Sequence, residues 1–184
     1  MNVVEPIRSK KDLSRVEDVL LNESGIFGLR NLLIFLFGTN CGLRISDILN
    51  LDVEDVKNRS YIELTEIKTR KRKKIPINDK LKPLIEEFTK NRKNNEPLFI
   101  SKLGNRMERT QYYRILNDVC HKVGIDYKIG THTLRKTFGY HHYKKYKDVA
   151  LLQKIFNHSS PFVTLIYIGI NQDMLDSSYK SFIL

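Results

Sequence analysis

The sequence predicts a mainly α-helical domain with a small antiparallel β-sheet, an α+β fold covering residues 1–184 as one unit. Apolar residues recur at helical spacing through most of the chain, whereas alternation typical of strands is confined to residues 61–77. A length of 184 residues and a hydrophobic content of 41% suit a single buried core. No repeat, low-complexity tract or Pro/Gly-rich linker marks a second domain.

The N-terminal quarter is expected to form three helices. Ser9 caps the first, which ends between Asn22 and Gly25. The second covers residues 29–37, whose apolar residues are dense enough for burial on most sides, and it stops near residues 38–40, where turn-forming residues begin. A short helical turn follows at residues 45–49.

The middle of the chain is expected to form a β-hairpin. Residues 61–65 alternate as a strand does, and residues 74–77 form its partner, with Pro76 indicating an edge. The turn between them carries the basic run of residues 70–74. Residues 97–100 are a candidate third strand.

The remaining segments are expected to be helical. Each has a polar residue suited to capping its first turn or apolar residues at helical spacing. The first of these helices is capped by Asn78 or Asp79 and runs through Phe88, and the second covers residues 110–123. Thr131 caps a third at 134–146, Asp148 caps a fourth at 149–157, and Ser160, followed by Pro161, caps a fifth that runs through Tyr167. A sixth covers residues 172–179. The last is partly apolar and near the end of the sequence, so it is expected to dock on its own domain or on a neighbouring protein.

The charge balance indicates a polyanionic partner. Lys and Arg number 32 against 21 Asp and Glu, which gives a net charge of +11 and a pI near 9.6. The cations also cluster, at residues 70–74 and again at Lys144, Lys145 and Lys147. Because phosphate backbones attract such clusters, nucleic acid is the leading candidate.

The sequence carries no sign of a membrane or secreted protein. No apolar run reaches the roughly 18 residues of a membrane span, and residues 1–11 lack the apolar stretch of a signal peptide. Cys41 and Cys120 lie 79 positions apart without CxxC spacing. We therefore expect a cytoplasmic protein with no membrane contact, in which both thiols are buried and reduced.

The histidines do not form a metal-binding pattern. The candidates are His132, His141, His142 and His158. They occur without an HExxH motif, an acidic cluster or a cysteine pair. Neither a metal ion nor an organic cofactor is expected.

Four short motifs, taken together, carry a family resemblance. They are residues 39–49 (TNCGLRISDIL), residues 66–76 (EIKTRKRKKIP), residues 132–138 (HTLRKTF), and residues 156–160 (FNHSS) with Tyr167 nine positions after His158. Each is weak alone, but in this order the chain resembles the tyrosine recombinases, or phage integrases. Asn157 stands where that family often has glycine, and Asp47 where it more often has glutamate; neither change removes a group that the reaction needs.

The resemblance implies a catalytic domain that cuts and rejoins DNA strands. It extends over nearly the whole chain, and the family's N-terminal core-binding and arm-binding domains are not seen in the sequence. Two alternatives stay open: a stand-alone short recombinase, or a piece of a longer integrase. The implied partners are double-stranded DNA, further copies forming a tetramer on it, and accessory proteins that bend DNA.

The chemistry of strand cleavage fits the residues in these motifs. Charge that builds on the phosphate in the transition state suits two arginines, Arg44 and Arg135, because a guanidinium donates two hydrogen bonds and stays ionised. Tyr167 is the nucleophile by resemblance and forms a 3′-phosphotyrosyl bond. Since the pKa of a tyrosine is about 10, a cationic pocket is expected to assist its deprotonation.

The remaining residues receive supporting roles by resemblance and charge. Lys68 is the candidate general acid for the departing 5′ oxygen. His132 either exchanges protons or orients the phosphate, whereas His158 donates a hydrogen bond to it. Asp47 is expected to orient Arg44 or a histidine. The predicted contacts to the DNA backbone are Arg70, Lys71, Arg72, Lys73, Lys74 and Lys136.

Two other functions were weighed against recombination. A non-catalytic DNA-binding protein of the same fold predicts losses among the reactive residues, and the sequence has none. An RNA-binding protein is supported by charge alone, because no ribonucleoprotein aromatic motif or GxxG loop is present.

Overall fold

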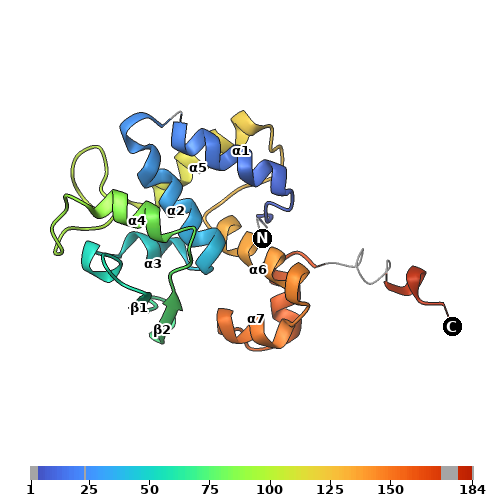
Figure 1. The fold of residues 1–184 in the computed structure, drawn as a ribbon. Coiled ribbons are helices and arrows are strands. Elements are labelled where there is room, and N and C mark those ends of the chain that lie inside the picture. The colour runs from blue at the N-terminus through green and yellow to red at the C-terminus, as the bar shows by residue number, and fades with distance from the viewer. Residues whose placement is uncertain (1–3, 23, 171–177, 184) are drawn as a thin grey trace.

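The structure is a computed structural model that describes residues 4–22, 24–170 and 178–183, and it confirms the predicted fold class (Figure 1). Among the described residues, the sheet has two antiparallel strands, β1 (Tyr61–Thr65) and β2 (Arg72–Pro76). The helices are α1 (Lys10–Asn22), α2 (Gly28–Cys41), α3 (Ile45–Leu49), α4 (Lys82–Thr89), α5 (Arg109–Val123), α6 (Thr133–Tyr146), α7 (Val149–Phe156) and α8 (Pro161–Tyr167), with 3-10 turns η1 (Gly25–Phe27) and η2 (Val53–Asp55). No helix in these described ranges is long and apolar enough to cross a membrane.

Three of the predicted helix caps are confirmed. In each case the side chain accepts a hydrogen bond from the backbone N–H three residues later, which satisfies a group that the helix leaves unpaired. The donor-to-acceptor distances are 3.1 Å at Ser9, 2.8 Å at Asp148 and 3.2 Å at Ser160. Asn78 Oδ1 accepts from Leu81 N at 3.0 Å, but α4 begins only at Lys82, so Asn78 lies in the turn before the helix and does not cap it.

The end of α2 and the start of α6 also differ from the prediction. Helix α2 continues past Gly38 to Cys41, because Gly38 lies inside the helix and packs against Leu134, where an added Cβ would be 2.5 Å from the Leu134 Cβ. Helix α6 is not capped by Thr131. It begins at Thr133, whose Oγ1 accepts a hydrogen bond from Gly130 N at 3.1 Å.

The predicted third strand at residues 97–100 does not form. This segment makes only isolated bridges, Asp52 with Pro97 and Ile100 with Arg106. The Arg92 guanidinium bonds the carbonyls of residues 97 and 98, both at 2.5 Å, and so occupies acceptors that a neighbouring strand would need. Strand β2 begins at Arg72, two residues before its predicted start. The predicted helix at 172–179 lies largely outside the described residues.

The apolar side chains form two clusters. The larger is centred on α2, whose residues 32–37 are all buried, and both Cys41 and Cys120 are buried in it, as predicted. The smaller contains Leu152, Phe156 and Ile168 and joins α6, α7 and α8. In Figure 1 the β1–β2 hairpin and α7 lie in the same lower part of the view, with α6 above α7. The motifs converge between the two clusters.

Candidate active site

Arg135 forms the buried floor of the candidate site. Its Nη1 donates a hydrogen bond to the Gly42 carbonyl at 2.5 Å and its Nη2 donates to the Phe156 carbonyl at 3.0 Å, and the residue is only 2% exposed. Both carbonyls lie at helix C-termini, where the helix dipole stabilises a cation. Burial, together with the Arg44 charge, lowers the pKa of Arg135 to about 10, so the guanidinium stays protonated near neutral pH.

Arg44 reaches the same place from the end of α2. Gly42 ends that helix in the left-handed region at φ 62°, and a Cβ there would lie 2.6 Å from the Phe138 ring, so both backbone and packing require glycine. The chain then turns, and Arg44 precedes α3 with 14% of its side chain exposed. The structure therefore brings Arg44 and Arg135, the arginine pair, to one site from two motifs 90 residues apart.

Asp47 lies where it can orient Arg44, as the sequence suggests. Its Oδ2 is 3.9 Å from Arg44 Nη1, and its Oδ1 accepts a hydrogen bond from the backbone N–H of Ile67 at 2.9 Å. The side chain is 1% exposed. Asp47 therefore links Arg44 to the start of the turn that carries Lys68.

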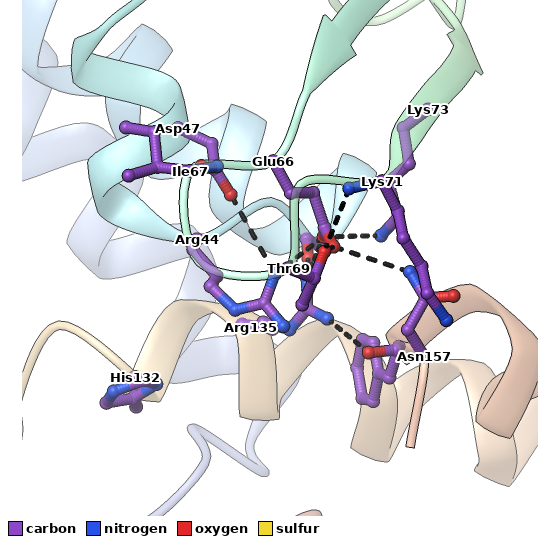
Figure 2. A network of polar contacts seen from close by, with 12 residues as sticks. Arg44, Asp47, Glu66, Ile67, Thr69, Lys71, Lys73, His132, Arg135 and Asn157 are labelled. Atoms are coloured by element: carbon purple, nitrogen blue, oxygen red, sulfur yellow. Dashed lines mark hydrogen bonds and ion pairs between the residues drawn. The ribbon is translucent and has the colours of Figure 1, made fainter. Parts of the chain in front are cut away.

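Glu66 lies at the centre of the network in Figure 2, although the sequence analysis gave it no role. Its Oε1 is 2.6 Å from Arg44 Nη1, 3.0 Å from Lys73 Nζ and 3.8 Å from Arg135 Nη1. Its Oε2 accepts hydrogen bonds from Thr69 Oγ1 at 2.6 Å and from Asn157 Nδ2 at 3.3 Å. An acidic residue just before a basic run resembles an ordinary surface glutamate in the sequence, and only the fold shows that it is buried.

Tyr167 lies at the end of α8 with its hydroxyl 3.4 Å from Nδ1 of His132. The rings of His158 and Phe156 pack edge-on against it, with ring-centre distances of 5.0 and 5.6 Å. Burial raises the pKa of Tyr167, and the positive charges of Arg135 and Arg44 only partly oppose this. The cations favour deprotonation of Tyr167, as expected, but in the DNA-free protein their effect on its pKa is smaller than that of burial. The tyrosine therefore needs a base.

Both candidate histidines are neutral near pH 7. Burial, reinforced by the charges of Lys68 and the arginine pair, lowers the pKa of His132. Burial and the arginine pair also lower the pKa of His158, to about 4. His158 Nδ1 lies 3.1 Å from the Thr164 hydroxyl, so a hydrogen bond from Nε2 to a phosphate requires that this hydroxyl donate to Nδ1.

Lys68 and Lys73, two of the four lysines of the hairpin, differ in exposure. Lys68 lies in the exposed turn, close enough for its charge to act on His132. Lys73 is 12% exposed, and its Nζ donates to the Ile155 carbonyl at 2.6 Å while pairing with Glu66. The role of Lys68 as general acid stays a prediction.

The predicted DNA contacts also differ in exposure. Arg70, Lys71, Arg72 and Lys74 are exposed, and Lys74 pairs with Glu63 at 2.8 Å. Lys73 and Lys136 are less exposed, and their ammonium groups have partners inside the protein: Lys136 is 7% exposed, with Nζ 5.3 Å from the centre of the Tyr167 ring. DNA contact by all six cations stays a prediction.

Comparison with known sequences defines the class of this protein. Residues 12–174 match the phage integrase family, so the chain belongs to that family, the tyrosine-type site-specific recombinases. A probable integrase/recombinase from Bacillus subtilis, YoeC, is 48% identical over 99% of this chain and 98% of its own length. Tyrosine recombinase XerD from Oceanobacillus iheyensis is 26% identical, covering 96% of this chain but 61% of its own length.

Solved structures agree on the fold. The XerA recombinase superposes with a TM-score of 0.76 at 23% identity, covering 96% of this chain and 63% of that one. The catalytic domain of bacteriophage HP1 integrase superposes with a TM-score of 0.65 at 21% identity, covering 97% and 95%. The chain thus matches nearly all of an isolated catalytic domain and about three fifths of the XerD and XerA proteins.

Proposed function

We propose that this recombinase cleaves a DNA strand by attack of the Tyr167 hydroxyl oxygen on a phosphodiester held by Arg44 and Arg135. The observation that carries the proposal is the meeting of the Tyr167 hydroxyl, His132 Nδ1 and the arginine pair, of which Arg135 is buried and Arg44 partly exposed, at one site. A pre-positioned pair of guanidinium groups stabilises charge that develops on the phosphate, without reorganisation during the reaction.

His132 acts as the base in this proposal. A neutral imidazole nitrogen beside the phenol hydroxyl accepts its proton as the oxygen attacks phosphorus. A 3′-phosphotyrosyl bond forms, and the bond between phosphorus and the 5′ oxygen breaks. His158 donates a hydrogen bond to the phosphate from Nε2.

Lys68 completes the cleavage step by giving a proton to the departing 5′ oxygen, which leaves as a hydroxyl. The covalent link conserves the energy of the phosphodiester, so the reverse attack by a 5′ hydroxyl rejoins the strand without a cofactor. Each residue thus returns to its starting protonation state after rejoining.

The substrate in this proposal is double-stranded DNA, and four copies of the chain assemble on it for strand exchange. Exposed cations on the hairpin contact the backbone of the DNA. The XerH recombinase, a structural neighbour with a TM-score of 0.75 at 18% identity, has been solved with its difH substrate in a post-cleavage complex, which supports DNA as the substrate class.

A covalent adduct tests the proposal directly. A duplex from DNA flanking the gene, nicked near the cleavage site so that the cut end diffuses away, is incubated with wild-type protein and with Tyr167→Phe. Wild type should give a protein–DNA adduct that survives denaturation, and Tyr167→Phe should bind the same DNA without forming it. Binding by wild type with no adduct at any of several candidate sites would reduce the protein to a non-catalytic DNA-binding role.

A further inference from the structure

The buried carboxylate of Glu66 has more partners than an ordinary ion pair. Glu66 is 0% exposed, and its two oxygens meet three cations and two neutral donors from separate parts of the fold. These donors come from the end of α2, the β1–β2 hairpin, α6 and the corner after α7. One carboxylate therefore connects the elements that carry Arg44, Lys68 and Arg135, although it does not contact α8, which carries Tyr167.

Glu66 does not simply fill the place of a DNA phosphate until DNA arrives. Its backbone is fixed on both sides, because its N–H donates to Lys71 O and its carbonyl accepts from Arg70 N, both at 2.9 Å. Releasing the side chain would also take this acceptor from the partly buried donors Thr69 and Asn157, and would leave Lys73 with only the Ile155 carbonyl. The carboxylate is thus a permanent part of the site.

The turn that carries Lys68 is held from both sides by carboxylates. Asp47 Oδ1 accepts from Ile67 N at 2.9 Å, on one side of Lys68, and Glu66 Oε2 accepts from Thr69 Oγ1 at 2.6 Å, on the other. Both carboxylates also face Arg44 Nη1, at 3.9 Å from Asp47 and 2.6 Å from Glu66. Figure 2 shows the labelled Ile67 and Thr69 on this turn, with Asp47, Glu66 and Arg44 around it.

We propose that Glu66 is a positioning residue that fixes the Lys68 turn against the arginine pair, so that proton donor and phosphate-binding groups meet the same phosphodiester. This inference rests on the proposed function. Glu66 touches neither the phosphate nor the departing oxygen. It acts through Thr69 on the placement of Lys68, and through Arg44 on the phosphate, while its negative charge reduces the repulsion among Arg44, Arg135 and Lys73.

A change of leaving group separates this role from a general structural one. When sulfur replaces the 5′ bridging oxygen, the departing group is a thiol, whose pKa is far below that of an alcohol, so it leaves as a thiolate without needing the Lys68 proton. A defect in the placement of Lys68 must therefore shrink with the sulfur substrate. A defect in the nucleophile, the phosphate clamp or folding must persist.

The experiment measures single-turnover adduct formation by wild type, Glu66→Gln and Thr69→Val on the oxygen and sulfur duplexes. Glu66→Gln should cut the oxygen substrate about 10- to 100-fold more slowly, and its deficit on the sulfur substrate should be at least about fivefold smaller. Thr69→Val keeps the carboxylate and removes a hydroxyl that donates to Glu66 at 2.6 Å and accepts from Lys71 N at 3.4 Å, both within the turn. It should show the same selectivity for the oxygen substrate, and it keeps the test possible if Glu66→Gln folds poorly. Glu17→Gln, which removes a carboxylate paired with Lys80 at 2.6 Å, is the matched control and should equal wild type.

The outcomes separate this inference from the proposed function. Wild-type rates for Glu66→Gln and Thr69→Val, or equal deficits on the two substrates, would overturn the positioning role while leaving recombination intact. If wild type itself formed no adduct with either duplex, the proposed function would fail first and the inference with it. Selective rescue by sulfur in both variants supports it.

Discussion

The hydroxyl oxygen of Tyr167 lies 3.4 Å from Nδ1 of His132. Burial lowers the pKa of His132, and the cations that suit a phosphate lower it further, because a protonated ring would add to their repulsion. A site assembled to hold an anion therefore also holds a base in its reactive form next to the nucleophile.

Removing the charge of Lys68 should raise the pKa of His132. Burial lowers the pKa of His132 most, and the charge of Lys68 is the next largest cause. Lys68→Gln therefore removes a charge that disfavours the imidazolium. The measurement is an NMR titration of the His132 ring in DNA-free protein, which does not depend on activity. Lys71→Gln changes another exposed cation of the same turn and should leave the titration in place. Identical curves for wild type and Lys68→Gln would show that the turn holds Lys68 away from His132.

The fold was predictable from the sequence where a signal is local. Ser9, Asp148 and Ser160 mark helix starts because a side-chain oxygen needs only its own first turn. The end of α2 was misplaced because Gly38 is explained by its packing against Leu134, which is 96 positions away. The third strand failed for a similar reason, since a side chain, Arg92, takes the carbonyls that a strand partner would use.

The residues of the candidate site were likewise predictable from the sequence only where a local motif marks them. Arg44, Arg135 and Tyr167 were identified through motifs, and the structure brings them together. Glu66 received no role, since a glutamate followed by cations has no local feature that separates a buried counter-ion from a surface residue. The inward direction of Lys73 and Lys136 was equally hidden, because alternation along a short twisted hairpin or along a buried helix does not identify the partner of an ammonium group.

Asn157 should tolerate glycine better than alanine. It ends α7 in the left-handed region at φ 55°, where a Cβ costs roughly 1 kcal/mol and glycine costs nothing. Both variants lose the hydrogen bond to Glu66, so the difference between their free energies of unfolding reports the cost of the left-handed backbone conformation alone. Chemical denaturation should give a free energy of unfolding about 1 kcal/mol lower for Asn157→Ala than for Asn157→Gly. Equal values would indicate that the backbone relaxes out of the left-handed region in the alanine variant.

Thr164→Val should slow adduct formation through His158. The buried Thr164 hydroxyl lies 3.1 Å from His158 Nδ1 and 3.2 Å from the Ser160 carbonyl, which is its other acceptor. When the hydroxyl donates to Nδ1 it selects the tautomer with a proton on Nε2, and the valine variant loses this selection. We expect cleavage to slow by about tenfold with little change in DNA binding. Thr164→Ser retains the hydroxyl and should stay near the wild-type rate. A serine variant as slow as the valine variant would instead point to lost packing of the methyl group.

Acid should selectively remove the stability that Glu66 contributes. Its neighbours Thr69, Lys73 and Arg44 outweigh the opposing effect of burial and lower its pKa from 4.5 to about 2. A carboxylate whose pKa is lower in the folded than in the unfolded state contributes stability that is complete above pH 4.5 and is lost as the pH falls toward 2. The free energy of unfolding of wild type relative to Glu66→Gln should therefore be constant from pH 7 to 5 and then decrease, by on the order of 2 kcal/mol, as the pH falls further. Urea denaturation of both proteins across this range provides the measurement, and the Glu17→Gln variant corrects for the general effect of acid. A difference that stays constant down to pH 2.5 would mean that Glu66 is not held as a buried, ionised counter-ion.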